Sequence, residues 1–334
     1  MLQAILNRSP EIGLAGETHF FDDLRPRMNG KSLRNMTPEE RITCSDYFRV
    51  LTLRPYGFRA DPLQSPLSRE QLLADAEERG DTVDAVFEAY CHWRLRATGR
   101  RIWGEKTPRH IFRIRDIFSA FPDARVICMV RDPRAVVASY RDWEFQGGLK
   151  KAEGNADYQA AIAEDQVRKN ASYHIVIASM MWRAAARAAV TAISEHSEER
   201  VLILRYEDVV DDPAAAIGRV SEWIGTAYSD SMLEIPLLNS SATKFQAEVG
   251  PSSAPNKRWR SVLSEREIAV IQHVAGNSLT QAGYTTEAAK AGLINLISAY
   301  ASVPFAVVRA AKANRGRYSS LPSYVARRVK AALK

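Results

Sequence analysis

Short apolar runs alternate with longer segments of helical periodicity over the first two thirds of the chain. The apolar runs lie at residues 12–15, 102–104, 126–130 and 200–205. Their near-continuous hydrophobicity is typical of strands buried on both faces of a parallel sheet. Helical spacing of apolar residues extends over residues 2–8, 68–79, 82–98, 108–121, 133–140, 157–195 and 264–281. This alternation through residues 1–225 predicts one doubly wound α/β domain with helical additions after it.

Polar side chains directly follow the strand at residues 126–130. Arg131 stands at its carboxyl end, and Asp132-Pro133 is a helix-start signature in which Asp is the N-cap and Pro occupies the first turn. An arginine beside a helix N-terminus favours anion binding, because the free amide groups and the helix dipole attract negative charge. Ser139 lies eight residues after Arg131, about two turns into the helix, where its hydroxyl could join the same site.

Two further strands also end in polar clusters. The strand at residues 12–15 runs into GETHFFDD, residues 16–23, and the strand at residues 102–104 runs into EKTP, residues 105–108. Ligands of open α/β sheets bind outside the carboxyl ends of the strands, so repeated clusters there favour a binding site. A purely structural interpretation stays open for each cluster. The first could be a solvated turn over an aromatic plug, and the second a threonine N-cap beside a solvated ion pair.

Three other segments could contact a ligand. Tyr206 follows the strand at residues 200–205, where a ligand contact and an ordinary packed tyrosine are equally open. Residues 147–155 contain glycine and lysine and could form a lid. Residues 251–260, PSSAPNKRWR, predict a basic loop around a tryptophan that either closes over a nucleotide or is a solvated surface loop. The tripeptide GKS at residues 30–32 does not predict a Walker A loop, because Arg25 stands where that motif needs glycine.

The distribution of charge argues against a nucleic-acid partner. The chain of 334 residues has a net charge of +7, but nine of its 46 basic residues and none of its 39 acidic ones follow Glu287. The residues before that point are therefore slightly acidic overall, and the basicity belongs to a tail. We expect residues 1–287 to form the α/β domain and residues 288–334 a basic amphipathic helical tail. That tail could lie on an anionic membrane, bind an acidic polysaccharide or be a solvated extension.

Composition sets further bounds. The 46% hydrophobic content supports a sizeable core. Three scattered cysteines without CxxC spacing predict neither a disulfide framework nor a zinc site, so a reducing compartment is the simplest interpretation. The N-terminus lacks the basic region and cleavage site of a signal peptide. The most apolar window, residues 291–308, is interrupted by Asn295, Ser298, Ser302 and Pro304, which argues against a membrane-spanning helix.

These motifs together resemble the sulfotransferase superfamily that uses 3′-phosphoadenosine 5′-phosphosulfate (PAPS). They are most similar to its Glu-dependent branch of tyrosylprotein, heparan-type and many bacterial sulfotransferases. The resemblance covers residues 1 to about 285 and rests on GETHFF, EKTP, RDP with its serine, RYED and NKRWR in family order. It implies an α/β fold of the P-loop-NTPase-like sulfotransferase type and transfer of a sulfuryl group from PAPS to an acceptor hydroxyl. PAPS is then a co-substrate, and no metal is implied.

The resemblance assigns one set of residues to the nucleotide. Arg131 and Ser139 match, at the family spacing, the pair that holds the 3′-phosphate. Tyr206, in RYED, matches a tyrosine that lies near the adenine. The segment 256–260 matches a loop that closes on the cofactor, and its cations are Lys257, Arg258 and Arg260.

The resemblance assigns the other two clusters to catalysis and the acceptor. Glu17 matches the glutamate base, which would take the proton from the acceptor hydroxyl, and Lys106 would stabilise charge on the transferring group. His19 and Asp22 match residues that line the acceptor site in heparan-type members. Phe20 belongs to the aromatic pair after the base and is expected to contact the acceptor. That apolar pair is also expected to raise the pKa of Glu17 toward neutrality.

The chain departs from the family pattern at its N-terminus. Family members begin with a strand and a (K/R)SGT(S/T) loop that grips the 5′-phosphosulfate, whereas Met1-Leu2-Gln3 falls where the following helix starts. Either the start is set too late, or the protein is a catalytically impaired relative that binds a nucleotide or glycan. The motifs do not specify whether the acceptor is a sugar, a lipid, a tyrosine or a small molecule. We expect a cytoplasmic protein, or one that is peripheral to the membrane through its tail.

Overall fold

The computed structural model describes residues 1–28, 30–96, 98–142, 154–235, 250–251, 254–289 and 292–315. Its strands are β1 (Ile12–Ala15), β2 (Ile102–Glu105), β3 (Val126–Val130) and β4 (Val201–Arg205). The helices up to β3 are α1 (Leu2–Leu6), α2 (Leu24–Met28), α3 (Pro38–Leu53), α4 (Arg69–Arg79), α5 (Val83–Leu95) and α6 (Ile114–Ala120). Those after β3 are α7 (Pro133–Arg141), α9 (Ala156–Ser172), α10 (Ile175–His196), α11 (Tyr206–Asp211), α12 (Pro213–Ile224), α13 (Ala254–Lys257), α14 (Trp259–Val262), α15 (Glu265–Ala275), α16 (Asn277–Gln281), α17 (Leu293–Ala301) and α18 (Val303–Ala313). Four 3-10 helices complete the described elements: η1 (Leu33–Asn35), η2 (Pro62–Gln64), η3 (Pro108–Phe112) and η4 (Asp230–Leu233).

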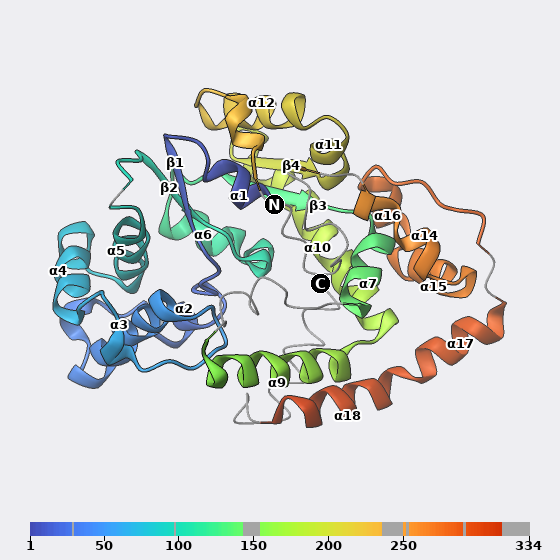
Figure 1. Cartoon of the computed structure of the whole chain (residues 1–334), viewed down its shortest axis with the longest axis horizontal. Coiled ribbons are helices and arrows are strands. Elements are labelled where there is room, and N and C mark those ends of the chain that lie inside the picture. Colours follow the sequence, from blue (N-terminus) through green and yellow to red (C-terminus); the bar gives the residue numbers. More distant parts are fainter. Residues whose placement is uncertain are drawn as a thin grey trace. The chain divides into compact units, whose positions relative to one another are not determined.

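The chain divides into two compact units. Unit 1 comprises Met1–Val126 and Ile217–Ile235, and unit 2 comprises Ile127–Ala216 and Pro236–Lys334. β1 pairs with β2, and β3 pairs with β4, so each strand pair belongs to one unit apart from the first residue of β3 (Figure 1). The predicted α/β class is confirmed. The predicted boundary at Glu287 stays a prediction, since part of the proposed tail lies outside the described residues.

Unit 1 is organised around the parallel pair of β1 and β2. Ala15 lies opposite Glu105 in the register, so the segments after both strands emerge at the same edge. The pair leaves no room for a side chain at Gly104, where a Cβ atom would come within 2.7 Å of Leu14 Cδ2. Helices α3, α4 and α5 pack against one another beside it. These contacts fix where the polar residues after β1 and β2 begin.

Unit 2 is built from α7, α10 and α15, which pack against one another. The predicted helix start after β3 is confirmed, because the Asp132 side chain accepts a hydrogen bond of 2.8 Å from the backbone N–H of Arg134. At the start of α15, Ser264 and Glu267 form a capping box. Such caps satisfy backbone donors that the helix itself leaves open.

The structure divides three of the predicted helices. Residues 157–195 form α9 and α10, because His174 has extended backbone angles. Residues 264–281 form α15 and α16, separated by Gly276 with a positive φ of 55°. Residues 108–121 form the 3-10 helix η3 and then α6. Apolar spacing continues across each break, so the pattern alone predicted longer helices.

Candidate active site

A buried carboxylate joins the segments that follow β1 and β2. Glu105, whose side chain is 4% exposed, accepts hydrogen bonds at Oε1 from the Thr18 backbone N–H at 2.6 Å and the Thr18 hydroxyl at 2.8 Å. The same oxygen accepts from the Thr107 hydroxyl. Its other oxygen, Oε2, lies 3.1 Å from His110 Nδ1. Glu105 therefore fixes the two polar segments relative to each other.

Thr107 adds a second connection between these segments. Its hydroxyl oxygen accepts from the backbone N–H groups of Thr18 at 3.1 Å and His19 at 3.2 Å. As N-cap of η3 it makes no side-chain capping bond. The interpretation of Thr107 as a mere helix cap, left open by the sequence, is therefore wrong. Its hydroxyl holds the loop that carries Glu17 and His19.

Glu17 lies between two cationic or protonatable groups. Its Oε1 forms an ion pair with Lys106 Nζ, and its Oε2 lies 3.5 Å from His19 Nε2. Burial acts to raise the pKa of Glu17, but the hydrogen bond from His19 and the charge and hydrogen bond of Lys106 outweigh it and lower this pKa to about 2. The three predicted catalytic residues are thus brought together, with the carboxylate ionised.

The expected effect of the phenylalanine pair is wrong. Phe20 is fully buried and Phe21 nearly so, and both rings belong to the aromatic core of unit 1. Phe20 stacks on Phe87 with ring centroids 4.6 Å apart. Glu17 instead keeps 40% of its side chain exposed and contacts Lys106, which lowers its pKa. Phe20 is therefore placed in the core, and the structure does not support the predicted acceptor contact.

His19 is held in an unusual backbone conformation. Its φ of 53° is in the left-handed region, which residues other than glycine adopt at an energetic cost. Its ring stacks on Tyr56 at a centroid distance of 4.1 Å, and the Tyr56 hydroxyl donates to Asp23 at 2.9 Å. Three residues on, Asp22 is largely buried and pairs with Arg113 at 3.4 Å. This arrangement orients the imidazole toward Glu17.

In unit 2, Arg131 and Tyr206 form the second predicted cluster. Arg131 follows β3 and Tyr206 begins α11 directly after β4, so adjacent strands deliver them. The guanidinium carbon of Arg131 lies 4.3 Å from the centroid of the Tyr206 ring. The Arg131 carbonyl accepts a hydrogen bond of 2.8 Å from Trp182 Nε1. Ser139 is half-buried on α7, the helix that Arg131 precedes.

A partly buried hydrogen-bond chain supports this cluster. Glu207 Oε1 accepts from the backbone N–H of Asp132 at 3.1 Å, and its Oε2 accepts from the Tyr284 hydroxyl at 2.6 Å. Asp132 also forms a 2.7 Å ion pair with the buried Arg134. Carboxylates thus anchor the turn between β3 and α7. Glu207 is the E of the RYED motif, but no role was predicted for it from the sequence.

The basic segment before α15 differs from the predicted loop. Its described residues form the short helices α13 and α14, and Trp259 is buried in the core of unit 2. Arg258 forms a 2.6 Å ion pair with Asp142, and Arg260 pairs with Glu287. Lys257 is exposed. The interpretation of the tryptophan as a ligand contact is therefore corrected, because its ring is buried and the guanidinium carbons of Arg134 and Arg260 each lie 4.4 Å from its centroid.

The predicted site residues are thus divided between the two units: Glu17, His19, Asp22 and Lys106 belong to unit 1, and Arg131, Ser139, Tyr206, Lys257, Arg258 and Arg260 belong to unit 2. Contacts join Glu17 to His19 and Lys106 in the first set, and Arg131 to Tyr206 in the second. The proposed lid at residues 147–155 falls almost entirely outside the described residues. In the described part of the chain, no three His, Cys, Asp or Glu side chains are grouped so that they could hold a metal ion. The GKS lysine pairs with Glu40, which agrees with its exclusion as a phosphate loop.

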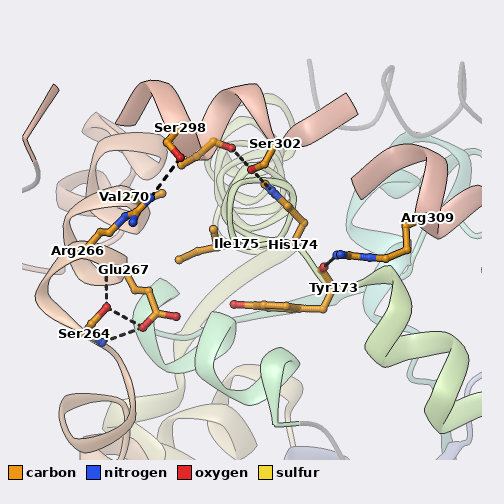
Figure 2. A pocket seen from close by; sticks show the side chains of 11 residues that line it. Tyr173, His174, Ile175, Ser264, Arg266, Glu267, Val270, Ser298, Ser302 and Arg309 are labelled. Atoms are coloured by element: carbon orange, nitrogen blue, oxygen red, sulfur yellow. Dashed lines mark hydrogen bonds between the residues drawn. The ribbon is translucent and has the colours of Figure 1, made fainter. Parts of the chain in front are cut away.

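Unit 2 also contains an open pocket of about 470 Å³ that none of the predicted site residues lines (Figure 2). Tyr173 and His174 line it from the segment before α10, Glu267 from α15, and Ser298 and Ser302 from α17 and the residue after it. The pocket lies beneath α17.

Comparisons with known proteins show which family the chain is similar to. A family model described as "Sulfotransferase family" matches residues 1–230. Carbohydrate sulfotransferase 2 of Homo sapiens and that of Mus musculus are each 24% identical over 185 residues, which is 48% of this chain and 35% of the relative. The matched part thus spans about a third of the length of these relatives.

A comparison of structures finds a similar fold. The sulfotransferase domain from the Synechococcus PCC 7002 olefin synthase matches with a TM-score of 0.50 and 15% sequence identity, over 86% of this chain and 90% of that domain. At this identity the likeness concerns the fold alone. The family match covers the whole of the Glu17 cluster, and also Arg131 and Tyr206.

Proposed function

Because the chain belongs to the sulfotransferase family, we propose that it transfers a sulfuryl group from PAPS to an acceptor hydroxyl, with Glu17 as the general base. The observation that carries this proposal is the contact of Glu17 with Lys106 and His19 at the shared carboxyl edge of β1 and β2. A carboxylate beside a cation and an imidazole can accept a proton while the cation stabilises developing negative charge.

The cluster at Arg131 suits a phosphorylated nucleotide. A guanidinium group presents several N–H donors in one plane, which fits phosphate oxygens, and Arg131 precedes the N-terminus of α7. Its contact with the Tyr206 ring restricts its orientation before a ligand arrives. We assign Arg131, Ser139 and Tyr206 to binding the nucleotide. When bound, PAPS would supply the sulfuryl group that is transferred.

Lys106 would have two successive partners in this proposal. In the structure it pairs with Glu17 and helps to lower the pKa of that carboxylate to about 2. Such a carboxylate is ionised but is a weak base. If Lys106 turns toward the sulfuryl oxygens, Glu17 loses its strongest cationic partner and its pKa rises. The base would therefore become stronger when the donor is in place.

The acceptor that we propose is a carbohydrate hydroxyl. The matched human and mouse relatives are named carbohydrate sulfotransferases, and their matched stretch covers about half of this chain. In the cluster around Glu17, His19 Nε2 and the carboxylate of Glu17 lie close enough together to bind the same hydroxyl group. Asp22, paired with Arg113, would orient the surrounding loop.

Replacement of Glu17 by glutamine tests the proposal directly. Glu17→Gln keeps the size of the side chain but removes the proton acceptor, so we expect transfer to fall about 100- to 10,000-fold. Calorimetry with 3′-phosphoadenosine 5′-phosphate should give an unchanged affinity. Transfer would be followed by mass spectrometry with a panel of glycans and PAPS. Glu77→Gln, which removes a surface carboxylate paired with Arg41 in the same unit, is the matched control and should retain full activity.

Two outcomes would overturn the proposal. Full activity of Glu17→Gln would rule out its role as the base. Nucleotide binding by the unmodified protein, without transfer to any glycan, lipid or phenol of the panel, would make it a binding protein instead of an enzyme.

A further inference from the structure

The segment formed by α17 and α18 is strongly apolar but scarcely buried. Two segments of the described chain, Ile175–His196 and Leu293–Ala313, are long and apolar enough to cross a membrane by length and composition alone. The first is α10, which packs against α7 and α15 in the core of unit 2. Of the most apolar window of α10, 44% is buried, whereas only 11% of the corresponding window of the second segment is buried. The apolar side chains of α17 and α18 are therefore mostly not used to build the core.

The side of α17 that faces α10 and α15 is held by two serine contacts and by a small apolar cluster. The Ser302 hydroxyl lies 2.9 Å from His174 Nε2, and the Ser298 hydroxyl accepts a 3.5 Å hydrogen bond from Arg266 (Figure 2). Ala299 is buried between these serines, and Leu296 packs against the same core cluster. In Figure 2 both serines point down toward the pocket. Polar contacts thus fix which face of the segment is turned outward.

The outward face of the segment is a continuous apolar stripe. Ile294 is 81% exposed, Ile297 59%, Phe305 79% and Val308 54%. These positions, with Ala301 and Lys312, follow the helical period of 3.6 residues from the start of α17 to the end of α18. Leu293 and Tyr300 are also exposed and widen the stripe. Exposed apolar surface of this kind marks a site of interaction.

Charge selects the partner of this stripe. Lys312 and Arg315 are exposed at its C-terminal end, and no acidic residue follows Glu287 in the sequence. A second copy of the chain would bring the same cations against each other or leave them next to apolar surface. An anionic lipid surface attracts the cations and takes up the apolar side chains between its head groups. A helix that crossed the bilayer would have to break the serine contacts with His174 and Arg266.

We propose that the stripe Ile294–Ile297–Phe305–Val308, with Lys312 and Arg315, docks the protein on the surface of an anionic lipid bilayer. In this proposal the segment lies parallel to the membrane surface and its apolar side chains insert into the bilayer. Its serines keep their contacts with His174 and Arg266. Sulfuryl transfer does not depend on this contact, so the proposal can fail without the proposed activity failing.

Co-sedimentation of the full chain with vesicles tests the docking. Vesicles of phosphatidylcholine with phosphatidylglycerol should bind the protein, and pure phosphatidylcholine should bind it markedly less. Phe305→Asp with Ile294→Asp should lower the partition coefficient at least tenfold. Lys312→Glu with Arg315→Glu should lower it about fivefold for each cation removed, and high salt should have the same effect.

Matched variants exist on the rest of the surface. Leu63→Asp changes another strongly exposed leucine, and Arg79→Glu another exposed arginine. Both should leave the partition coefficient unchanged. The circular dichroism spectrum and the activity on a soluble acceptor should be the same in every variant, because the changed side chains are exposed.

Four outcomes would overturn the docking proposal. Equal binding to neutral and anionic vesicles would show that Lys312 and Arg315 do not select an anionic surface. Loss of binding in the Leu63 or Arg79 variants would show that the stripe is not the site. A dimer in solution that Ile294→Asp dissociates, with no vesicle binding, would assign the stripe to a second copy. Resistance to extraction by alkaline carbonate would indicate a spanning segment.

Discussion

The two strand-end clusters hold their charges in different ways. After β1 and β2, a carboxylate is buried at the centre and the reactive groups Glu17 and Lys106 neutralise each other at the partly exposed edge. After β3 and β4, Arg131 lies against the ring of Tyr206, and a neighbouring arginine, Arg205, against that of Tyr284. A compensated pair can exchange a proton and release a cation, whereas stacked guanidinium groups stay charged and can only bind anions.

Under the proposed function, this difference would give each cluster one half of the transfer reaction. The first cluster suits proton transfer at the acceptor, and the second suits retention of a phosphorylated donor. The distinction also predicts opposite responses to substitution: changes at the first cluster should affect rate and pH dependence, and changes at the second should affect affinity.

Glu105→Ala should have the largest effect. It removes a buried carboxylate that holds both segments of the first cluster, and it leaves His110 Nδ1 and the hydroxyl groups of Thr18 and Thr107 without their carboxylate acceptor. We expect the free energy of unfolding to fall by about 3–5 kcal/mol. Urea denaturation followed by tryptophan fluorescence measures it. Glu88→Ala removes the carboxylate from a more exposed Glu–His pair on α5 and should cost no more than about 0.5 kcal/mol. Equal losses in the two variants would show that Glu105 is not the anchor of the cluster.

Arg131→Lys should come next and should act on affinity. Lysine keeps the charge but cannot stack or donate in a plane, so binding of 3′-phosphoadenosine 5′-phosphate should weaken about 10- to 100-fold. Binding of adenosine 5′-phosphate, which lacks the 3′-phosphate, should change little. Calorimetry with both nucleotides measures how much each affinity changes between the variant and the unmodified protein. Arg125→Lys changes an arginine that stacks on Trp223 in unit 1 and is the control. An equal loss of affinity for both nucleotides would show that Arg131 does not bind the 3′-phosphate.

The sequence alone predicted where these clusters begin. Each cluster follows a short apolar run. The helix start at Asp132-Pro133 could be predicted, because capping depends on adjacent residues. The low pKa of Glu17 could not be predicted from the sequence, because it depends on the fold that brings the His19 ring and Lys106, 89 positions further along the chain after β2, to this carboxylate. The same holds for Glu105, which a neighbouring lysine and threonine made to look like part of a solvated turn.

The second cluster shows the same limit. Basic residues around Trp259 were predicted to be a ligand-binding loop, but the ring is buried in the core and contacts the guanidinium groups of Arg134 and Arg260. Composition indicates that a segment is basic and aromatic. It does not indicate which carboxylates neutralise the cations, because Asp142 and Glu287 lie in other parts of the sequence.

Lys106→Gln should change the pH dependence of the first cluster. With Lys106 present the pKa of Glu17 is about 2, below its usual value of 4.5, so ionised Glu17 stabilises the fold above pH 4.5 and this contribution is lost as the pH falls toward 2. Removal of the lysine should raise the pKa of Glu17 by about one to two units. A carbon-13 NMR titration of the glutamate carboxyl groups reads this directly. Lys31→Gln, which unpairs Glu40 instead, should leave the resonance of Glu17 unchanged. An unshifted Glu17 in Lys106→Gln would contradict the pairing.

Asp142→Asn should have the smallest effect of these substitutions. It changes an ion pair of unit 2 and should act on nucleotide affinity. Asp142 neutralises Arg258, and the adjacent charges of Arg141 and Arg258 hold the pKa of this partly buried carboxyl below its usual range despite its desolvation. The substitution frees Arg258 while costing no more than about 1 kcal/mol of stability, because the pair is partly exposed. If Arg258 contacts the nucleotide, the affinity for 3′-phosphoadenosine 5′-phosphate should rise about two- to fivefold at low salt, and Arg258→Gln in the same background should abolish the gain. An affinity that stays constant in both variants would place Arg258 among the structural ion pairs of unit 2 and leave anion binding in this cluster to Arg131.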